Sequence, residues 1–165
     1  MADERVSYAL DGATALIGLN RADKRNAIDE ATVQALRAAV LRAHDEASVG
    51  VLFGHGSNFS AGLDLGEALA RATGQIAPPR KRRRHSWHEV FDQIARGPIP
   101  FVGALHGAVV GGGLELASCA HVRVADDTAY FGLPEGQRGI FLGGGGSVRV
   151  SKLIGFSRVT EMMLT

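Results

Sequence analysis

The fold is most clearly indicated by one stretch of the chain, His106-Gly107-Ala108-Val109-Val110-Gly111-Gly112-Gly113-Leu114-Glu115-Leu116. It follows an apolar segment, 101–105, that is typical of a buried strand, and it leads into an apolar segment, 113–120, that is typical of a short helix. The glycine triplet between them carries no side chains, so its backbone can approach a ligand or another segment closely. A strand, a glycine turn and a helix in this order indicate an α/β fold.

The same alternation of strand and helix continues on both sides of this stretch. Asp11-Gly12 predicts a hairpin turn between two β-rich segments, and Asp29, Ser86 and Ser157 are suitable helix N-caps. No clear period is present from Gly66 to about Pro79. We expect strands at 6–10, 14–20, 49–53, 101–105, 122–125 and 129–131, and helices at 29–43, 86–96, 113–120, 147–154 and 157–164. A single domain over residues 1–165 suits this length.

Composition excludes several classes of protein. The net charge is +1, so the chain as a whole is not built to bind nucleic acid. The run Arg80–Arg84 favours a solvated loop over a nucleic-acid patch, and attraction of the phosphates of a ligand remains an alternative. One cysteine, Cys119, cannot form an internal disulfide, and the six histidines lack metal-ligand spacing. There is no signal sequence and no apolar run that could cross a bilayer, so we expect a cytoplasmic protein without a membrane or metal partner.

Two glycine turns are candidates for binding an anionic oxygen. Ser60-Ala61-Gly62-Leu63-Asp64 and Gly111-Gly112-Gly113 each follow a predicted strand, and the second opens a helix. Backbone N–H groups at such turns, helped by the field of a helix N-terminus, can form an oxyanion hole if two of them point at one carbonyl oxygen. For each turn considered alone, close packing of helix on strand is the favoured alternative. This preference applies only until the two turns are considered together.

Two carboxylates stand in apolar surroundings. Glu115 lies within Leu114-Glu115-Leu116-Ala117, and Glu135 follows Phe131-Gly132-Leu133-Pro134. Apolar surroundings disfavour the charged form, which suits a general acid or base. Either side chain could instead point to solvent from a short element, and the sequence leaves that alternative open.

Four stretches together resemble the enoyl-CoA hydratase (crotonase) family. They occur in the family's order, span most of the chain, and are specific as a set although each alone is weak. They are Asn20-Arg21-Ala22-Asp23-Lys24-Arg25-Asn26-Ala27-Ile28, Phe59-Ser60-Ala61-Gly62-Leu63-Asp64-Leu65, the stretch His106–Leu116, and Phe131-Gly132-Leu133-Pro134-Glu135.

The resemblance implies a fold and a set of site residues. The fold would be an α/β crotonase-type ββα spiral. The coenzyme A cleft would include Arg25, Ala27, Ala61, Asp64 and Leu65, with Arg25 and Ala27 near the nucleotide half. The oxyanion donors would be the N–H groups of Leu63 and Gly112. Hydratases carry a glutamate at both positions matched by Glu115 and Glu135, whereas isomerases usually keep only the second.

The activity implied is addition of water across the 2,3 double bond of an enoyl-CoA thioester, as in fatty-acid metabolism, with coenzyme A as part of the substrate and no separate cofactor. A double-bond isomerase, a thioester hydrolase and a non-catalytic acyl-CoA-binding subunit remain alternatives. The segments 86–92 and 133–141 resemble, more narrowly, the methylthioacryloyl-CoA hydratase branch.

Length is the main departure from the family. Its chains continue through helices that close the acyl pocket and build a trimer or a dimer of trimers, so we expect this chain to be truncated there. We also expect the apolar side chains of the last helix to be uncovered, namely those of Val159, Met162, Met163 and Leu164.

Overall fold

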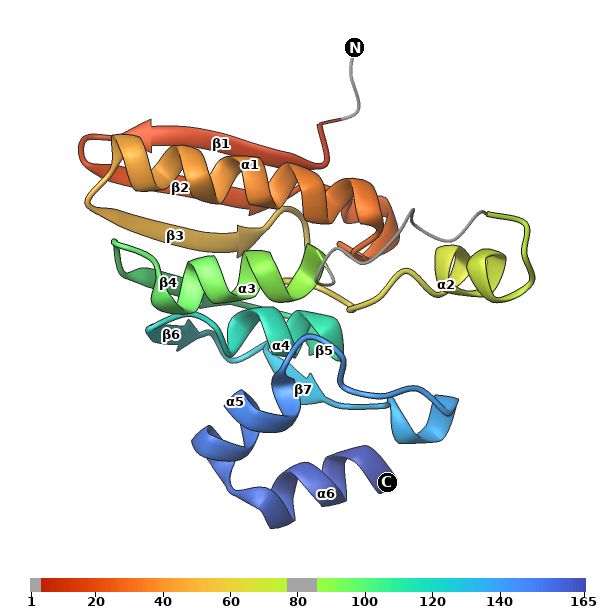
Figure 1. The fold of residues 1–165 in the computed structure, drawn as a ribbon. Helices are drawn as coiled ribbons and strands as arrows, with labels where there is room; N and C mark the ends of the chain where they lie inside the picture. The colour runs from red at the N-terminus through yellow and green to blue at the C-terminus, as the bar shows by residue number, and fades with distance from the viewer. Residues whose placement is uncertain (1–3, 77–85) are drawn as a thin grey trace.

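The main sheet of the molecule has five strands in the order β1-β2-β3-β4-β6, described in a computed structural model for residues 4–76 and 86–165 (Figure 1). Its strands are β1 Val6–Asp11, β2 Thr14–Leu19, β3 Val49–Gly54, β4 Phe101–Leu105 and β6 Val122–Ala125. A second sheet pairs β5 Ala108–Val110 with β7 Tyr130–Gly132 in parallel. The predicted α/β class is therefore confirmed.

The first two strands form the predicted hairpin. They are antiparallel, with Val6 opposite Leu19 and Asp11 opposite Thr14, and Gly12 in the turn has φ 56°. Every other pairing in this sheet is parallel. Parallel neighbours need long crossover connections, which here contain the helices.

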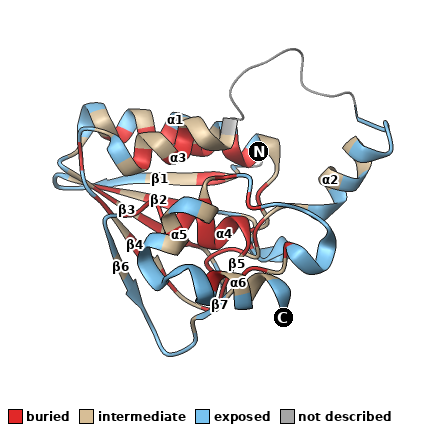
Figure 2. Cartoon of the chain, turned by 60° about the horizontal axis from the view of Figure 1, so that its bottom comes forward, coloured by how far each residue is buried: buried red, intermediate tan, exposed pale blue. Residues whose placement is uncertain are grey.

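Two helices, α1 Glu30–Glu46 and α3 Ser86–Arg96, lie side by side across one face of the sheet (Figures 1 and 2). Asp29 caps α1 as predicted, because its Oδ1 accepts the Thr32 N–H at 2.8 Å. The core lies between these helices and the sheet, where Phe101 is fully buried. Gly50 makes room for that ring, since an added Cβ there would lie 2.2 Å from Phe101 Cε1.

Shorter helices follow the strands. They are η1 Ala22–Lys24, α2 Leu65–Ala72, α4 Gly112–Ala117, η2 Gly136–Arg138, α5 Gly146–Ile154 and α6 Phe156–Leu164. Helix α2, a short helix with no buried residue, was not predicted from the sequence, although Leu65, Ala68, Leu69 and Ala72 recur at helical spacing. The N-cap expected at Ser157 is wrong, because α6 begins at Phe156 with Gly155 as its cap residue.

The last helix is better covered than the sequence suggested. Val159 is buried and Met162 and Met163 pack against the core, whereas Leu164 is 73% exposed. The helix lies against η2, where an added Cβ on Gly136 would come within 2.2 Å of the Met163 carbonyl oxygen. The expectation of four uncovered side chains is therefore wrong for Val159, and it holds for Leu164.

Candidate functional site

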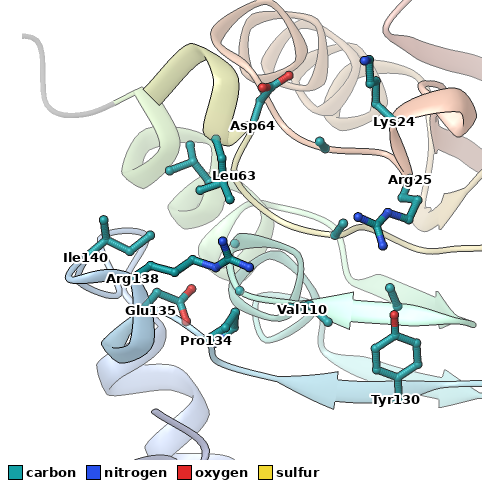
Figure 3. A pocket seen from close by; sticks show the side chains of 16 residues that line it. Lys24, Arg25, Leu63, Asp64, Val110, Tyr130, Pro134, Glu135, Arg138 and Ile140 are labelled. Carbon is teal, nitrogen blue, oxygen red and sulfur yellow. The ribbon is translucent and has the colours of Figure 1, made fainter. Parts of the chain in front are cut away.

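A cavity of about 400 Å³ opens where segments far apart in the sequence meet (Figure 3). One wall comes from the segments around η1 and the start of α2, another from β5 and the N-terminus of α4, and a third from η2. Its lining residues are Lys24, Arg25, Ala27, Ala61, Leu63, Asp64, Leu65, Ala108, Val110, Gly111, Gly112, Tyr130, Pro134, Glu135, Arg138 and Ile140. Eight of the nine residues predicted for the site are among them; the exception is Glu115.

The two glycine turns are in direct contact at this cavity. Gly62 has φ 87°, and a Cβ added there would lie 2.6 Å from the Val110 carbonyl oxygen and 2.9 Å from the Gly112 nitrogen. A Cβ added at Gly112 would lie 2.8 Å from the Trp87 ring and 3.5 Å from the Leu63 nitrogen. Glycine at position 62 therefore allows the two backbones to approach each other, and glycine at position 112 leaves room for the Trp87 ring.

The Leu63 and Gly112 N–H groups are both available at this junction. The Ile28 N–H donates to the Gly62 carbonyl at 2.7 Å, and the Asp64 N–H donates to the Ile28 carbonyl at 3.0 Å. This parallel bridge uses the residues flanking Leu63, so the Leu63 N–H points to the opposite side, and Gly112 is the first residue of α4 and has no intrahelical acceptor. Within the described part of the chain neither N–H has an acceptor.

The segment before α1 forms a rigid rim that carries Lys24 and Arg25. Buried Asn26, at φ 53°, donates through Nδ2 to the carbonyls of His55 at 2.9 Å and Asn58 at 2.7 Å. The Ala61 N–H donates to the Arg25 carbonyl at 2.9 Å, which ties this rim to the Gly62 turn. Arg25 and Ala27 thus lie near Ala61, and all three line the cavity.

Asp64 lines the cavity, but its carboxylate already has protein partners. It accepts the N–H groups of Gly66 at 3.0 Å and Glu67 at 3.3 Å, as the N-cap of α2, and it pairs with Arg21 Nη1 at 3.0 Å. Burial raises the pKa of this carboxyl, but the hydrogen bonds from Glu67 and Arg21 outweigh burial and hold the pKa below its usual range. Asp64 therefore stays ionised and holds the start of α2 at the cavity edge.

Glu135 is the carboxylate that faces the cavity (Figure 3). It is only 5% exposed, and its Oε2 is buried without a hydrogen-bond partner among the described residues. Burial raises the pKa of Glu135, and the nearby Arg138 guanidinium opposes that rise. The absence of a Cβ at Gly111 leaves room for this carboxyl, since an added Cβ would lie 2.8 Å from Glu135 Oε1.

Glu115 is buried in α4, and its carboxylate is held by a segment of four glycines, Gly143–Gly146. Its Oε1 accepts the N–H groups of Gly144 at 2.9 Å and Gly146 at 2.8 Å. Burial raises the pKa of Glu115; the Gly146 N–H opposes this, and the negative charge of Glu135 adds to it. The two glutamates are therefore close enough to influence each other's ionisation, although only Glu135 lines the cavity.

Sequence reasoning missed several lining residues, including Lys24, Arg138 and Tyr130. The first two were inside stretches that resemble the family, but no pattern marked either one as facing a ligand. Lys24, Arg138 and Arg25 together place three positive charges at the cavity, which favours an anionic ligand. Arg80–Arg84 lie outside the described residues.

Other kinds of site find no support in the described ranges, 4–76 and 86–165. No group of three or more His, Cys, Asp or Glu side chains there could hold a metal ion. None of the helices in these ranges is long and apolar enough for a membrane span.

Comparison with known proteins gives one consistent family. A model of the enoyl-CoA hydratase/isomerase family matches residues 10–165. The chain is 36% identical over 160 residues to an enoyl-CoA isomerase/hydratase of Zymoseptoria tritici, covering 93% of this chain and 51% of that protein. It is also 40% identical over 117 residues to a fatty acid oxidation complex subunit alpha of Shewanella loihica, covering 70% of this chain and 16% of that protein.

Solved structures agree with the sequence comparisons. An enoyl-CoA hydratase from Thermoplasma volcanium superposes with a TM-score of 0.86 at 30% identity, covering 98% of this chain and 64% of that one. A protein of Rhodopseudomonas palustris superposes at 0.84 with 44% identity, covering 98% and 61%. The crotonase-type fold is thus confirmed, and the chain spans about half the length of the Zymoseptoria relative.

Proposed function

Because the chain belongs to the enoyl-CoA hydratase/isomerase family, whose members act on acyl-CoA thioesters, we propose that it hydrates the 2,3 double bond of an enoyl-CoA. The observation that carries this proposal is a pair of N–H groups, those of Leu63 and Gly112, that have no acceptor among the described residues and lie beside the buried carboxyl of Glu135 in one cavity. This arrangement suits a reaction in which negative charge develops on a carbonyl oxygen while a proton moves nearby.

In the proposed reaction, both N–H groups donate to the thioester carbonyl oxygen. Water attacks C3, its oxygen forms the new C–O bond, and the electrons of the double bond move to give an enolate whose oxygen is held by the two donors. The enolate then takes a proton at C2. Each such donor contributes about 10²–10³-fold to the rate, because it acts where charge develops and is already oriented.

The two glutamates divide the proton transfers. We assign the base to Glu115, which takes a proton from the attacking water, and the acid to Glu135, which delivers a proton to C2. Raised pKa values of both carboxyls suit these roles, since a pKa nearer neutrality eases transfer in either direction. Coenzyme A enters as part of the substrate, with Lys24 and Arg25 placed to attract its phosphates, and the reaction needs no separate cofactor.

Crotonyl-CoA hydration is the direct test. We expect turnover by the purified chain and a loss of about 10²-fold or more on Glu135→Gln. Coenzyme A binding, measured by calorimetry, should survive in that variant, because Lys24 and Arg25 are untouched. Binding without turnover in the parent chain would instead support a non-catalytic acyl-CoA-binding subunit.

A second reaction, isomerisation of a 3-enoyl-CoA to the 2-enoyl-CoA, is favoured by one observation: only Glu135 lines the cavity, and Glu115 Oε1 is engaged by two N–H groups. A single carboxyl can move a proton between C2 and C4. The variant Glu115→Gln separates the two reactions, because hydration needs both glutamates in our assignment. If the parent chain and the Glu115→Gln variant both isomerise the substrate and neither hydrates it, the protein is an isomerase.

The acyl group and the assembly state form the finer part of the proposal. We propose that the cavity accepts short acyl groups, including methylthioacryloyl, and that the complete protein self-associates through exposed apolar surface that includes Phe156, Leu153 and Val124. Relative kcat/KM for crotonyl-CoA and methylthioacryloyl-CoA tests the first. Sedimentation of this chain and of a version extended by a relative's C-terminal region tests the second.

A further inference from the structure

Arg149, in α5, lies against the outer side of the glycine turn that holds Glu115. Its Nη2 donates a hydrogen bond to the Gly144 carbonyl oxygen. The next residue, Gly145, has φ 89°, and a Cβ added there would lie 2.9 Å from Nη2 and 3.0 Å from Nη1. Glycine at this position therefore lets the guanidinium lie flat against the turn.

Contacts with α3 fix the other side of the guanidinium. Arg149 Nη1 is 3.8 Å from Asp92 Oδ1, and its Cζ lies 5.7 Å from the centroid of the Phe91 ring. The side chain is 20% exposed. The hydrogen bond to Gly144 and these two longer contacts with α3 restrict the guanidinium, so it can hold the turn in place.

Gly144 is thus bonded on both sides. Its carbonyl accepts from Arg149, and its N–H donates to Glu115 Oε1 at 2.9 Å. A peptide segment that is held at its carbonyl cannot rotate freely, so the direction of the neighbouring N–H groups is fixed as well. The orientation of the Glu115 carboxylate then depends on Arg149 although the two side chains share no hydrogen bond among the described contacts.

We propose that Arg149 is a positioning residue for Glu115 and orients its carboxylate through the 144–146 turn. The charge of the guanidinium also favours the ionised carboxylate. Its part in catalysis rests on the proposed function, whereas its action on Glu115 can be measured without any turnover.

Charged and titratable groups lie near Glu115 on several of the elements packed around it. Glu135, at the start of η2, raises the Glu115 pKa when it is ionised, whereas Arg149 lowers that pKa. Asp92, on α3, faces Arg149. Cys119, just after the end of α4, stays neutral because burial raises its pKa to about 12. Removing the Arg149 charge should therefore shift the Glu115 titration to higher pH.

The experiment follows the Gly146 amide signal against pH in the ¹⁵N-glycine-labelled full chain. This amide donates to Glu115 Oε1 at 2.8 Å, so its chemical shift reports ionisation of that carboxyl, and Glu115→Gln assigns the titration by abolishing it. In Arg149→Met we expect the midpoint to rise and the exchange protection of Gly144 and Gly146 amides to fall. Arg149→Lys should restore the midpoint, since it restores the charge.

A matched control and a second variant keep the test decisive. Lys152→Met removes an exposed cation from the same helix and should leave the midpoint unchanged. If Arg149→Met does not fold, Arg149→Gln, which keeps a donor for Gly144, should raise the midpoint while protection is retained. An unchanged midpoint in whichever of these variants folds would overturn the proposal.

Activity then separates the inference from the proposed function. With crotonyl-CoA, Arg149→Met should lower kcat by about 10- to 100-fold with little change in KM, the loss expected when a reacting group is displaced by about 1 Å. A shifted midpoint in a chain that never hydrates crotonyl-CoA would refute the hydratase assignment and leave the positioning role intact.

Discussion

Residues 4–76 and 86–121, here called the framework, and residues 122–165, the C-terminal segment, are packed very differently. The framework contributes most of the buried apolar side chains, whereas the C-terminal segment contributes Leu133, Leu142, Val150 and Val159 to the core. The segment also leaves large apolar side chains in solvent, as Figure 2 shows for β6, and these include Phe141 at 72% and Phe156 at 77% exposed. Both regions nevertheless form the cavity.

This difference divides the site into two kinds of group. The N–H donors of Leu63 and Gly112 belong to the framework, where bridges 28–63 and 60–109 fix the backbone. Glu135 and Arg138 belong to the C-terminal segment, which rests on the framework through a few buried contacts. The two N–H donors and the proposed base Glu115 thus lie on the framework, and the proposed acid Glu135 lies on the segment with fewer buried side chains.

Truncating one phenylalanine in each region should give the largest contrast. Phe101→Ala removes a fully buried ring and should lower the free energy of unfolding by about 3–5 kcal/mol. Phe156→Ala removes an exposed ring and should change it by less than about 0.5 kcal/mol. Urea titration followed by circular dichroism measures both, and equal costs would abolish the distinction between the regions.

The glycines test whether the difference in packing extends to the site. Gly62→Ala places a methyl 2.9 Å from the Gly112 nitrogen, so it should separate the two donors and lower kcat/KM by about 10²–10³-fold. Gly139→Ala is the matched control, because Gly139 also has positive φ, at 64°, but nothing lies within 4 Å of the added Cβ. Gly139→Ala should lose only about 1–2 kcal/mol of stability, because of backbone strain at that position. It should keep its activity.

Glu135→Gln should make the protein more stable while making it inactive. Because the folded pKa of Glu135 is raised, its contribution to stability is fully present below the unfolded value and is lost as pH rises through the folded pKa. Glutamine escapes this loss, so we expect a gain of about 0.5–2 kcal/mol at neutral pH and none near pH 4. Thermal unfolding at both pH values measures it; Glu161→Gln, at an exposed position, is the control.

Asp64→Asn should give the smallest effect, with the opposite dependence on pH. The folded pKa of Asp64 is lowered, so its stabilisation is present above the unfolded value and is lost as pH falls through the folded pKa. Asparagine can still cap α2 but cannot pair with Arg21, so we expect a loss of about 0.5–1 kcal/mol at neutral pH that disappears in acid. A loss that is independent of pH would show that the cap, rather than the charge, is what matters.

Local patterns allowed the framework to be predicted from sequence. The Asp11-Gly12 hairpin and the Asp29 cap depend on residues a few positions apart, and both are confirmed. The short helix after the glycine triplet is confirmed too, although it begins at Gly112 and ends at Ala117.

Contacts between distant segments could not be predicted in this way. Nothing in the sequence linked Gly144 and Gly146 to Glu115, because the hydrogen bonds join residues 29 and 31 positions apart. Strand β5 was also missed. It has only three residues, and α4 and β6 separate it in the chain from its partner β7. The roles assigned to the nine predicted site residues remain predictions for the experiments above.

The bonds between Glu115 and the glycine turn also set an order of events during synthesis. Translation proceeds at about 5–20 residues per second, so Glu115 is made roughly 1.5–6 s before Gly146, the residue 31 positions later that completes its support. In that interval the growing chain has the donors of Leu63 and Gly112 but a glutamate with no partner in the turn. A ribosome-bound chain that ends shortly before residue 143 would therefore have to keep this carboxyl solvated or protonated until the rest of the turn emerges.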